Sequence, residues 1–439
     1  VADSGTLQIG IGSLGDAIAQ GLIVRDRHGE EYRRILESLC PDGVGNRELG
    51  RFDSGLYGCS EMFVNGFMQL IEAGIVRREV YADATLQRLI NDGRIAGSAV
   101  TPQTLRALLD AGRIGSPLAP GDLDFLLRFG VLRDDVRLDA DRLVLDDLRL
   151  ANDLRTPAAF DAVCEHLLGA RLAGGVCMHG GFFLGPGDFY ERLRRMPAAE
   201  LARIDMTRID FINQLDSANA GQAELKRAQR HRARFMNTTM IVTLLGAAVS
   251  DALESGQVVS GVGGQYNFVA MAHALPDARS ILMLRATHEN KNGLRSSIVW
   301  SYGHVTIPRH LRDIVITEYG VADLRGRSDT EVVQRLIAIA DSRFQDELVA
   351  QAKAHGKLAA HFEVPERYRQ NLPATLDDKL HPWSRAGLLP DFPFGTDLTD
   401  DELHIVRALK RLKHATEHPA ELVTMALKSL WEDKEAPRE

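Results

Sequence analysis

The stretch that decides the fold is Gly-Val-Gly-Gly followed by Gln-Tyr-Asn-Phe, residues 261–268. Two adjacent glycines after an apolar segment let the backbone turn tightly and approach a ligand with no Cβ in the way. A turn of this kind can aim backbone N–H groups at a carbonyl oxygen or a phosphate. Further along the chain stands a second distinctive stretch, Thr-Glu-Tyr-Gly-Val-Ala-Asp-Leu-Arg-Gly, residues 317–326. The first stretch predicts a turn that contacts a ligand.

The composition indicates a soluble globular protein of two or three domains. The chain has 439 residues, of which 45% are hydrophobic and 26% charged. A net charge of −8 argues against a general nucleic-acid binder. Four cysteines do not make a disulfide framework in a chain of this length, so we expect a cytoplasmic location. The longest apolar run, residues 240–249, is too short to span a bilayer, and we expect no membrane association.

Alternation of strand and helix signals predicts the α/β class with a parallel sheet. Helices are expected to begin at Asp16, at Glu61 and at Asp329, the second of them ending at Gly74. The expected strands are residues 7–12, 176–184, 240–245, 280–284, 297–300 and 313–317. No secretory segment is visible at Val1, and a strand-like segment follows almost at once. We therefore expect the chain to begin inside a longer polypeptide.

Four regions of different character follow one another. Residues 1–80 and 173–350 form the two parts of the predicted α/β domain. Residues 81–172 carry no glycine-rich signature and read as an inserted, mainly helical block, with a helix that begins at Thr101-Pro102 and a hairpin within 136–150. In residues 351–439, prolines break the chain into turns before an amphipathic helix that begins at Asp400.

The sequence Ser60-Glu61-Met62 holds the best candidate for chemistry. A carboxylate just inside a helix N-terminus is stabilised as an anion by the helix dipole and by free N–H groups. Glutamate in such a place can act as a nucleophile, because carboxylates form covalent acyl intermediates in some enzymes. The alternative reading is a helix N-terminal acid with Ser60 as its cap.

In their order along the chain, four segments resemble the C-terminal half of the acetyl-CoA hydrolase/transferase family. They are residues 7–12, 58–62, 260–265 and 317–326, and the resemblance covers residue 7 to about 75 and 174 to about 348. Two features depart from the family. Asn267 stands where the family usually has Asp, and the N-terminal domain of the family is absent.

The resemblance implies the open CoA-transferase fold, with helices on both faces of the sheet, and a mechanism. Glu61 would be the catalytic glutamate, which attacks the thioester of a short acyl-CoA such as acetyl-CoA and becomes a glutamyl-CoA thioester. A carboxylic acid then accepts the CoA, with coenzyme A a substrate and no permanently bound cofactor. The glycine turn would contact CoA through Gly261, Gly263, Gly264 and Gln265, with the amides of Gly263 and Gly264 as the oxyanion hole. Structural or supporting roles would fall to Ser60, Asn267, Glu318 and Tyr319.

Two other functions stay open: an acyl-CoA hydrolase, if water intercepts the intermediate, and a CoA-binding subunit or regulatory protein without turnover of its own. Because the family site lies between two α/β halves, we expect an N-terminal half, supplied upstream or in trans, and a homodimer. Alternatively, the block at residues 81–172 supplies the second wall of the cleft.

Three further patterns give weaker indications of a functional site. The pair Cys164-x-His166 and Cys177-x-His179 would make a zinc site only if all four side chains converged, and we interpret it as coincidence, with no metal. The basic run from Lys226 to Arg234 reads as a solvated helix face, with contact to CoA phosphates as the alternative. Residues 10–15 lack the complete dinucleotide-binding pattern of glycines.

Overall fold

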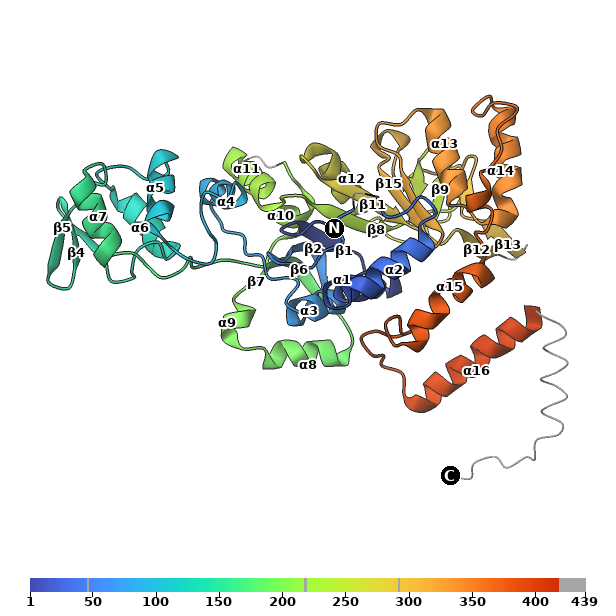
Figure 1. The fold of residues 1–439 in the computed structure, drawn as a ribbon, viewed down its shortest axis with the longest axis horizontal. Coiled ribbons are helices and arrows are strands. Elements are labelled where there is room, and N and C mark those ends of the chain that lie inside the picture. The colour runs from blue at the N-terminus through green and yellow to red at the C-terminus, as the bar shows by residue number, and fades with distance from the viewer. Residues whose placement is uncertain (46, 217–218, 291–292, 418–439) are drawn as a thin grey trace, which may run out of the picture.

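The chain folds around an eight-stranded sheet in the order β16-β15-β11-β8-β1-β2-β6-β7. The computed structural model describes residues 1–45, 47–216, 219–290 and 293–417 (Figure 1). All neighbours in the sheet are parallel except β15 and β16. The strands are β1 (Thr6–Ile9), β2 (Tyr57–Val64), β6 (Met178–Leu184), β7 (Ile204–Met206), β8 (Arg234–Thr238), β11 (Arg279–Met283), β15 (Ile314–Thr317) and β16 (Gly320–Asp323). The predicted fold class is confirmed.

Three apolar cores pack helices against this sheet, and one of them includes Val315 of β15 together with Leu336 and Leu348. Helices α1 (Ser13–Arg27) and α3 (Asn65–Glu72) contribute to a core that includes Ile9, Phe63 and Phe67. Helices α10 (Ile209–Asn213) and α12 (Gln265–Ala274) contribute to a separate core that includes Cys59 and Phe268. The remaining helices of the α/β part are α2 (Gly29–Leu39), α8 (Gly187–Arg195), α9 (Ala198–Leu201), α11 (Ala220–Gln229), α13 (Asp329–Ala338), α14 (Ser342–Ala354), η1 (Arg309–Leu311) and η2 (Glu366–Tyr368).

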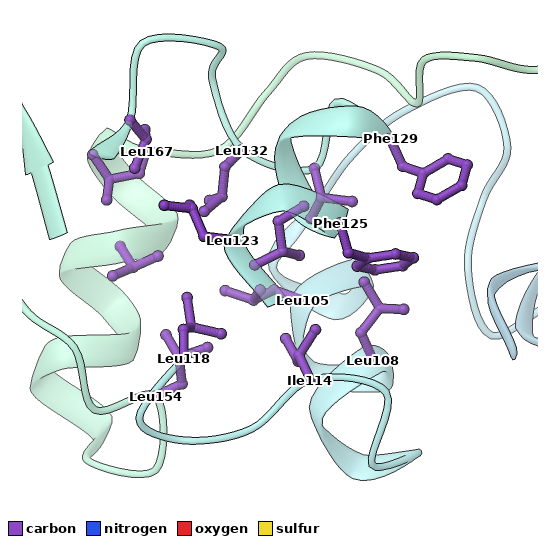
Figure 2. Close-up of a cluster of buried hydrophobic side chains, with 14 of the residues drawn as sticks. Leu105, Leu108, Ile114, Leu118, Leu123, Phe125, Phe129, Leu132, Leu154 and Leu167 are labelled. Carbon is purple, nitrogen blue, oxygen red and sulfur yellow. The ribbon is translucent and has the colours of Figure 1, made fainter. Parts of the chain in front are cut away.

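Residues 81–172 have an apolar core of their own. Every residue of that buried cluster lies between Tyr81 and Leu172, and Figure 2 shows its central leucines and phenylalanines packed together. The elements are α4 (Ala84–Asn91), α5 (Pro102–Asp110), α6 (Pro120–Arg128), β3 (Arg137–Asp139), β4 (Arg142–Leu145), β5 (Leu148–Ala151) and α7 (Pro157–His166). Helix α5 begins after Thr101, and the expected hairpin is part of the antiparallel sheet β3-β4-β5. The separate core supports the proposal that this block is an inserted domain.

The expected helix starts were partly wrong. Glu61 does not open a helix, because β2 continues beside β6 as far as Val64 and the helix α3 begins only at Asn65. Its end at Gly74, where φ is +73°, agrees with the prediction. Helix α1 begins at Ser13 after the N-cap Gly12, so Asp16 lies in its first turn. Ser328, whose hydroxyl accepts from the N–H of Glu331, caps α13 in place of Asp329.

Several strands were misplaced or missed. Residues 240–245 and 297–300 hold only β9 (Ile241–Thr243) and β14 (Ile298–Val299). These form a small separate sheet in which β9 lies between β14 and β10 (Ala248–Val249). The central strand β8 was missed because it starts inside the basic run, and the edge strands β7 and β16 were missed because they are short. A hairpin of β12 (Thr287–Asn290) and β13 (Gly293–Ser296) was also missed.

The C-terminal region contains α15 (Pro373–Arg385) and α16 (Asp400–Glu417), as far as the described residues extend. The amphipathic helix predicted from Asp400 is confirmed. Pro382 does not break the chain, because it lies inside α15. In the described ranges, no helix is both long and apolar enough to cross a bilayer.

Candidate functional site

Glu61 is the fifth of the eight residues of β2 and is half-buried. Its Oε2 accepts a hydrogen bond of 2.9 Å from the side-chain amide of Asn213, the last residue of α10. Asn213 is only 8% exposed, and its Oδ1 has no hydrogen-bond partner among the described residues. Because a buried acceptor is normally satisfied, this oxygen can receive a donor from a bound molecule.

Gly264 packs directly against this pair. A Cβ at Gly264 would lie 2.5 Å from Glu61 Oε2 and 2.6 Å from Asn213 Nδ2, far inside van der Waals contact. Gly264 is also the N-cap of α12, so the carboxylate faces the first turn of that helix. The first N–H groups of a helix lack partners within it and carry partial positive charge. A helix N-terminus next to Glu61 was predicted, but the helix is α12 and not one that Glu61 opens.

The rest of the predicted glycine turn lies next to Gly264. Gly261 and Gly263 are exposed, and a Cβ on either would meet nothing within 4 Å. Gly263 has a φ of +55°, in the left-handed region that favours glycine. Gln265 is buried, and its side-chain amide donates to the carbonyl of Thr238 at 2.8 Å. Gln265 therefore fixes the start of α12 to the carboxyl end of β8.

Comparison with known proteins shows a family match for the second part of the chain. Residues 185–352 match the acetyl-CoA hydrolase/transferase C-terminal domain. These residues belong to the acetyl-CoA hydrolase/transferase family. Asn213 and Gly264 lie inside the matched stretch, whereas Glu61 lies outside it and contacts the stretch through its hydrogen bond with Asn213.

The curated relatives match only parts of the chain. A probable butyrate:acetyl-CoA coenzyme A-transferase of Syntrophomonas wolfei is 36% identical over 121 residues, which are 27% of each chain. A succinyl-CoA:cyclohexane-1-carboxylate CoA transferase of Geobacter metallireducens is 31% identical over 180 residues, 40% of this chain and 37% of that one. The crystal structure of RipA from Yersinia pestis, 20% identical, covers 82% of this chain and 50% of its own with a TM-score of 0.44. The chain thus spans well under half of the length of these curated relatives.

Outside the glycine turn, the predicted support residues of the family domain make structural contacts. Ser60 is buried, and its hydroxyl donates to the carbonyl of Ile9 on the neighbouring strand at 3.1 Å. Glu318 accepts from the N–H of Ala286 at 2.9 Å. Glu318 follows β15, which is four strands from β2 in the sheet order, roughly 19 Å at ordinary strand spacing.

Among the described residues, neither of the other two support residues forms a hydrogen bond with Glu61. The hydroxyl of Tyr319 donates to Asp341 at 3.1 Å, and burial together with the Asp341 charge raises the pKa of this phenol. Asn267 is half-buried in α12. The structure therefore brings Gly264 to Glu61 but does not bring Glu318 or Tyr319 there.

Sequence reasoning missed Asn213. The residue stands in Ile-Asn-Gln-Leu, residues 212–215, which contains no recognised motif. Its only signal is a polar side chain at the end of a short apolar segment. Its proximity to Glu61 depends on the packing of α10 against β2 and so could not be read from the chain.

The two Cys-x-His elements lie in different parts of the fold. Cys164 packs against the core of the inserted block, whereas Cys177 belongs to the core under the main sheet. Burial raises the pKa of the Cys177 thiol to about 11, which disfavours the thiolate that binds metals. His179 contacts the Tyr57 hydroxyl through Nδ1 at 2.7 Å and Asp205 through Nε2 at 3.3 Å. Within the described ranges, no three His, Cys, Asp or Glu side chains are grouped as metal ligands.

The basic run does not form a solvated face as predicted, because Arg227 is exposed but other members of the run are buried. Lys226 and Arg230 are 1% and 2% exposed, because both point into the protein and donate to backbone carbonyls of residues 210–214. Arg234 is the first residue of the central strand β8. In residues 10–15, a Cβ on Gly15 would lie 2.4 Å from the carbonyl oxygen of Gly10, so a tight turn explains this glycine.

Proposed function

We propose that this chain carries the nucleophilic part of a CoA-transferase, which moves CoA between a short acyl-CoA, such as acetyl-CoA, and a carboxylic acid. The observation that carries the proposal is the position of the Glu61 carboxylate. It accepts a hydrogen bond from Asn213 and lies against Gly264 at the N-terminus of α12. The match of residues 185–352 to the acetyl-CoA hydrolase/transferase C-terminal domain supports the same chemistry. The similar curated proteins are CoA-transferases by name.

The proposed reaction has two exchange steps. Glu61 attacks the thioester carbonyl, and CoA leaves as a thiolate, which gives a mixed anhydride between Glu61 and the acyl group. The thiolate then attacks the Glu61 carbonyl, releases the first carboxylate, and forms the glutamyl-CoA thioester. A second carboxylate reverses both steps and leaves as the new acyl-CoA. Amides of Gly263 and Gly264 would stabilise the oxyanion formed in each addition.

The same site suits hydrolysis if water reaches the intermediate. Glu61 is only half-buried, and exposed apolar side chains surround its end of the sheet: Ile11, Phe182, Ile209, Val262 and Tyr266. A cleft with one wall leaves a thioester open to water, because water is excluded only when the site is covered. The exposed apolar side chains favour the presence of a second protein surface that covers the site in the active protein.

We propose that this cover is an N-terminal α/β half, encoded upstream or on another chain, and that the active protein is a cytoplasmic homodimer. A CoA-binding subunit without turnover is the remaining alternative. Measuring acyl exchange between labelled carboxylate and acyl-CoA separates the transferase from the hydrolase. Tight CoA binding with neither reaction would favour the binding subunit.

The experiment that tests the proposal traps the intermediate. The chain is incubated with acetyl-CoA, treated with borohydride, and mapped by peptide mass spectrometry. A glutamyl-CoA thioester is reduced to an alcohol, so the change should appear on Glu61 and be absent from the Glu61→Gln variant. Reduction at another residue, or none in a preparation that turns over acetyl-CoA, would contradict the mechanism.

A further inference from the structure

Two buried cations hold the segment that carries Asn213. Lys226 Nζ donates to the carbonyls of Asp210 at 3.1 Å and of Gln214 at 2.8 Å. Arg230 donates to the carbonyl of Phe211 and approaches Met271 Sδ at 3.2 Å. Residues 209–214, called here the Asn213 segment, are therefore held in place by side-chain hydrogen bonds to three of their carbonyl groups.

The two cations are unusual because both are almost fully buried and neither forms an ion pair within the described residues. Isolated buried charges are costly, and proteins normally pair them with carboxylates. Here the compensation comes from main-chain carbonyls, with the Phe211 ring at 5.3 Å from Lys226 Nζ. Burial, and next the Arg230 charge, lower the pKa of Lys226 from its ordinary value. Asp210, the carboxylate of this segment, pairs with Arg208 on the surface.

The Asn213 segment needs such an anchor because it is a five-residue helix with few internal hydrogen bonds. Without Lys226 and Arg230, the carbonyls of Phe211 and Gln214 would lose these donors, whereas the carbonyl of Asp210 also accepts from the N–H of Gln214 at 3.2 Å. Asn213, at its end, makes the 2.9 Å hydrogen bond to Glu61. Movement of the segment by an ångström would therefore remove that hydrogen bond and free the carboxylate to rotate.

We infer that Lys226 and Arg230 are positioning residues, which set the orientation of the Glu61 carboxylate through the Asn213 segment. The inference rests on the proposed function for its effect on rate, but its structural part is independent. Neither cation contacts Glu61, and both act through Asn213. A group that binds CoA phosphate would instead have to be accessible, and these two are not.

The test variant is Lys226→Met, which keeps the length of the side chain and removes its donor. The matched control is Arg227→Met on the same helix, because Arg227 is exposed and its partners, Ala274 and Asp216, lie outside the Asn213 segment. In single-turnover trapping of Glu61 with acetyl-CoA, Lys226→Met should slow thioester formation on the order of ten- to a hundred-fold. Arg227→Met should stay within twofold of the unaltered chain.

A double-mutant cycle with Asn213→Ala separates positioning from general stability. If Lys226 acts through Asn213, the loss caused by Lys226→Met should nearly vanish in the Asn213→Ala background. Full additivity, or an unchanged rate in Lys226→Met, would overturn the inference. If Lys226→Met does not fold, Arg230→Lys replaces it in the same cycle, because it keeps the charge but shortens the reach to Phe211.

Hydrogen exchange of residues 209–214 tests the anchoring of the Asn213 segment without measuring the reaction. Faster exchange there in Lys226→Met, with unchanged exchange in Arg227→Met, supports the anchoring. No thioester on Glu61 when the unaltered chain is combined with an N-terminal α/β half would contradict the proposed function alone, and unchanged exchange in Lys226→Met would overturn the anchoring alone.

Discussion

Replacing Gly264 with alanine tests the site with a single methyl group. The new Cβ would lie 2.5 Å from Glu61 Oε2, whereas an ordinary contact begins near 3.4 Å. The carboxylate and the Asn213 amide would therefore have to move by roughly 0.9 Å. A displacement of about 1 Å at a reacting group costs on the order of a hundredfold in rate. We expect kcat of the active protein to fall by about that factor.

The stability of the Gly264→Ala variant should change little. Gly264 has φ −84° and ψ 4°, which alanine adopts without strain. The poorer N-cap costs about 0.5–1 kcal/mol, and the loss of freedom in the unfolded chain offsets about 0.4–1 kcal/mol. Gly187→Ala is the matched control, because Gly187 also stands at the start of a helix and a Cβ there meets nothing within 4 Å. Steady-state kinetics and thermal unfolding measure both effects. Full activity in Gly264→Ala, or a collapse of stability in parallel with activity, would refute the reasoning.

Three further outcomes are expected. Glu61→Gln should lower turnover by several orders of magnitude while CoA binding, measured by calorimetry, persists; an active variant would remove Glu61 from the mechanism. The chain alone should show little transferase activity with acetyl-CoA and short carboxylates, and addition of an N-terminal α/β half should restore it; full turnover of the chain alone would contradict this. Leu105→Ala, in the core of the block shown in Figure 2, should destabilise residues 81–172 by about 2–5 kcal/mol in hydrogen exchange and leave thioester formation on Glu61 unchanged; a parallel loss at Glu61 would show that the block and the site are coupled.

The sequence was sufficient for the parts of the fold that local patterns determine. The apolar strands β1, β6, β11 and β15 and the helix from Asp400 were all predicted close to their observed limits. Strand β8 was not, because its first residue, Arg234, continues a basic run that resembles a helix face. Whether a lysine or arginine of that run faces solvent or the core depends on tertiary packing, which periodicity does not encode.

The candidate site was predictable only where one short stretch forms a recognisable motif. The Gly264 turn was expected to approach a ligand, and it packs against Glu61. The position of Glu61 in a strand was not expected, because Phe63, Phe67 and Leu70 follow at helical spacing, although Phe63 is still in β2. Asn213 comes from a segment that contains no motif, and the two buried cations come from the basic run, so only the packing of distant elements brings Asn213 to Glu61 and the cations to Asn213.

The attachment of the inserted block argues that it is not the second wall of the cleft. The block leaves and re-enters the sheet where the backbones of Val80 and Val176 exchange hydrogen bonds of 2.8 and 3.0 Å. Val176 precedes β6, whose residue Met178 pairs with Gly58 near the amino end of β2. Glu61 stands three residues further along β2, roughly 10 Å toward the carboxyl end, where ligands bind in parallel sheets. Figure 1 shows the elements from α5 to α7 extending from one end of the molecule, apart from the sheet. Since the block joins the sheet at the opposite ends of these strands, we expect the missing wall to come from another half.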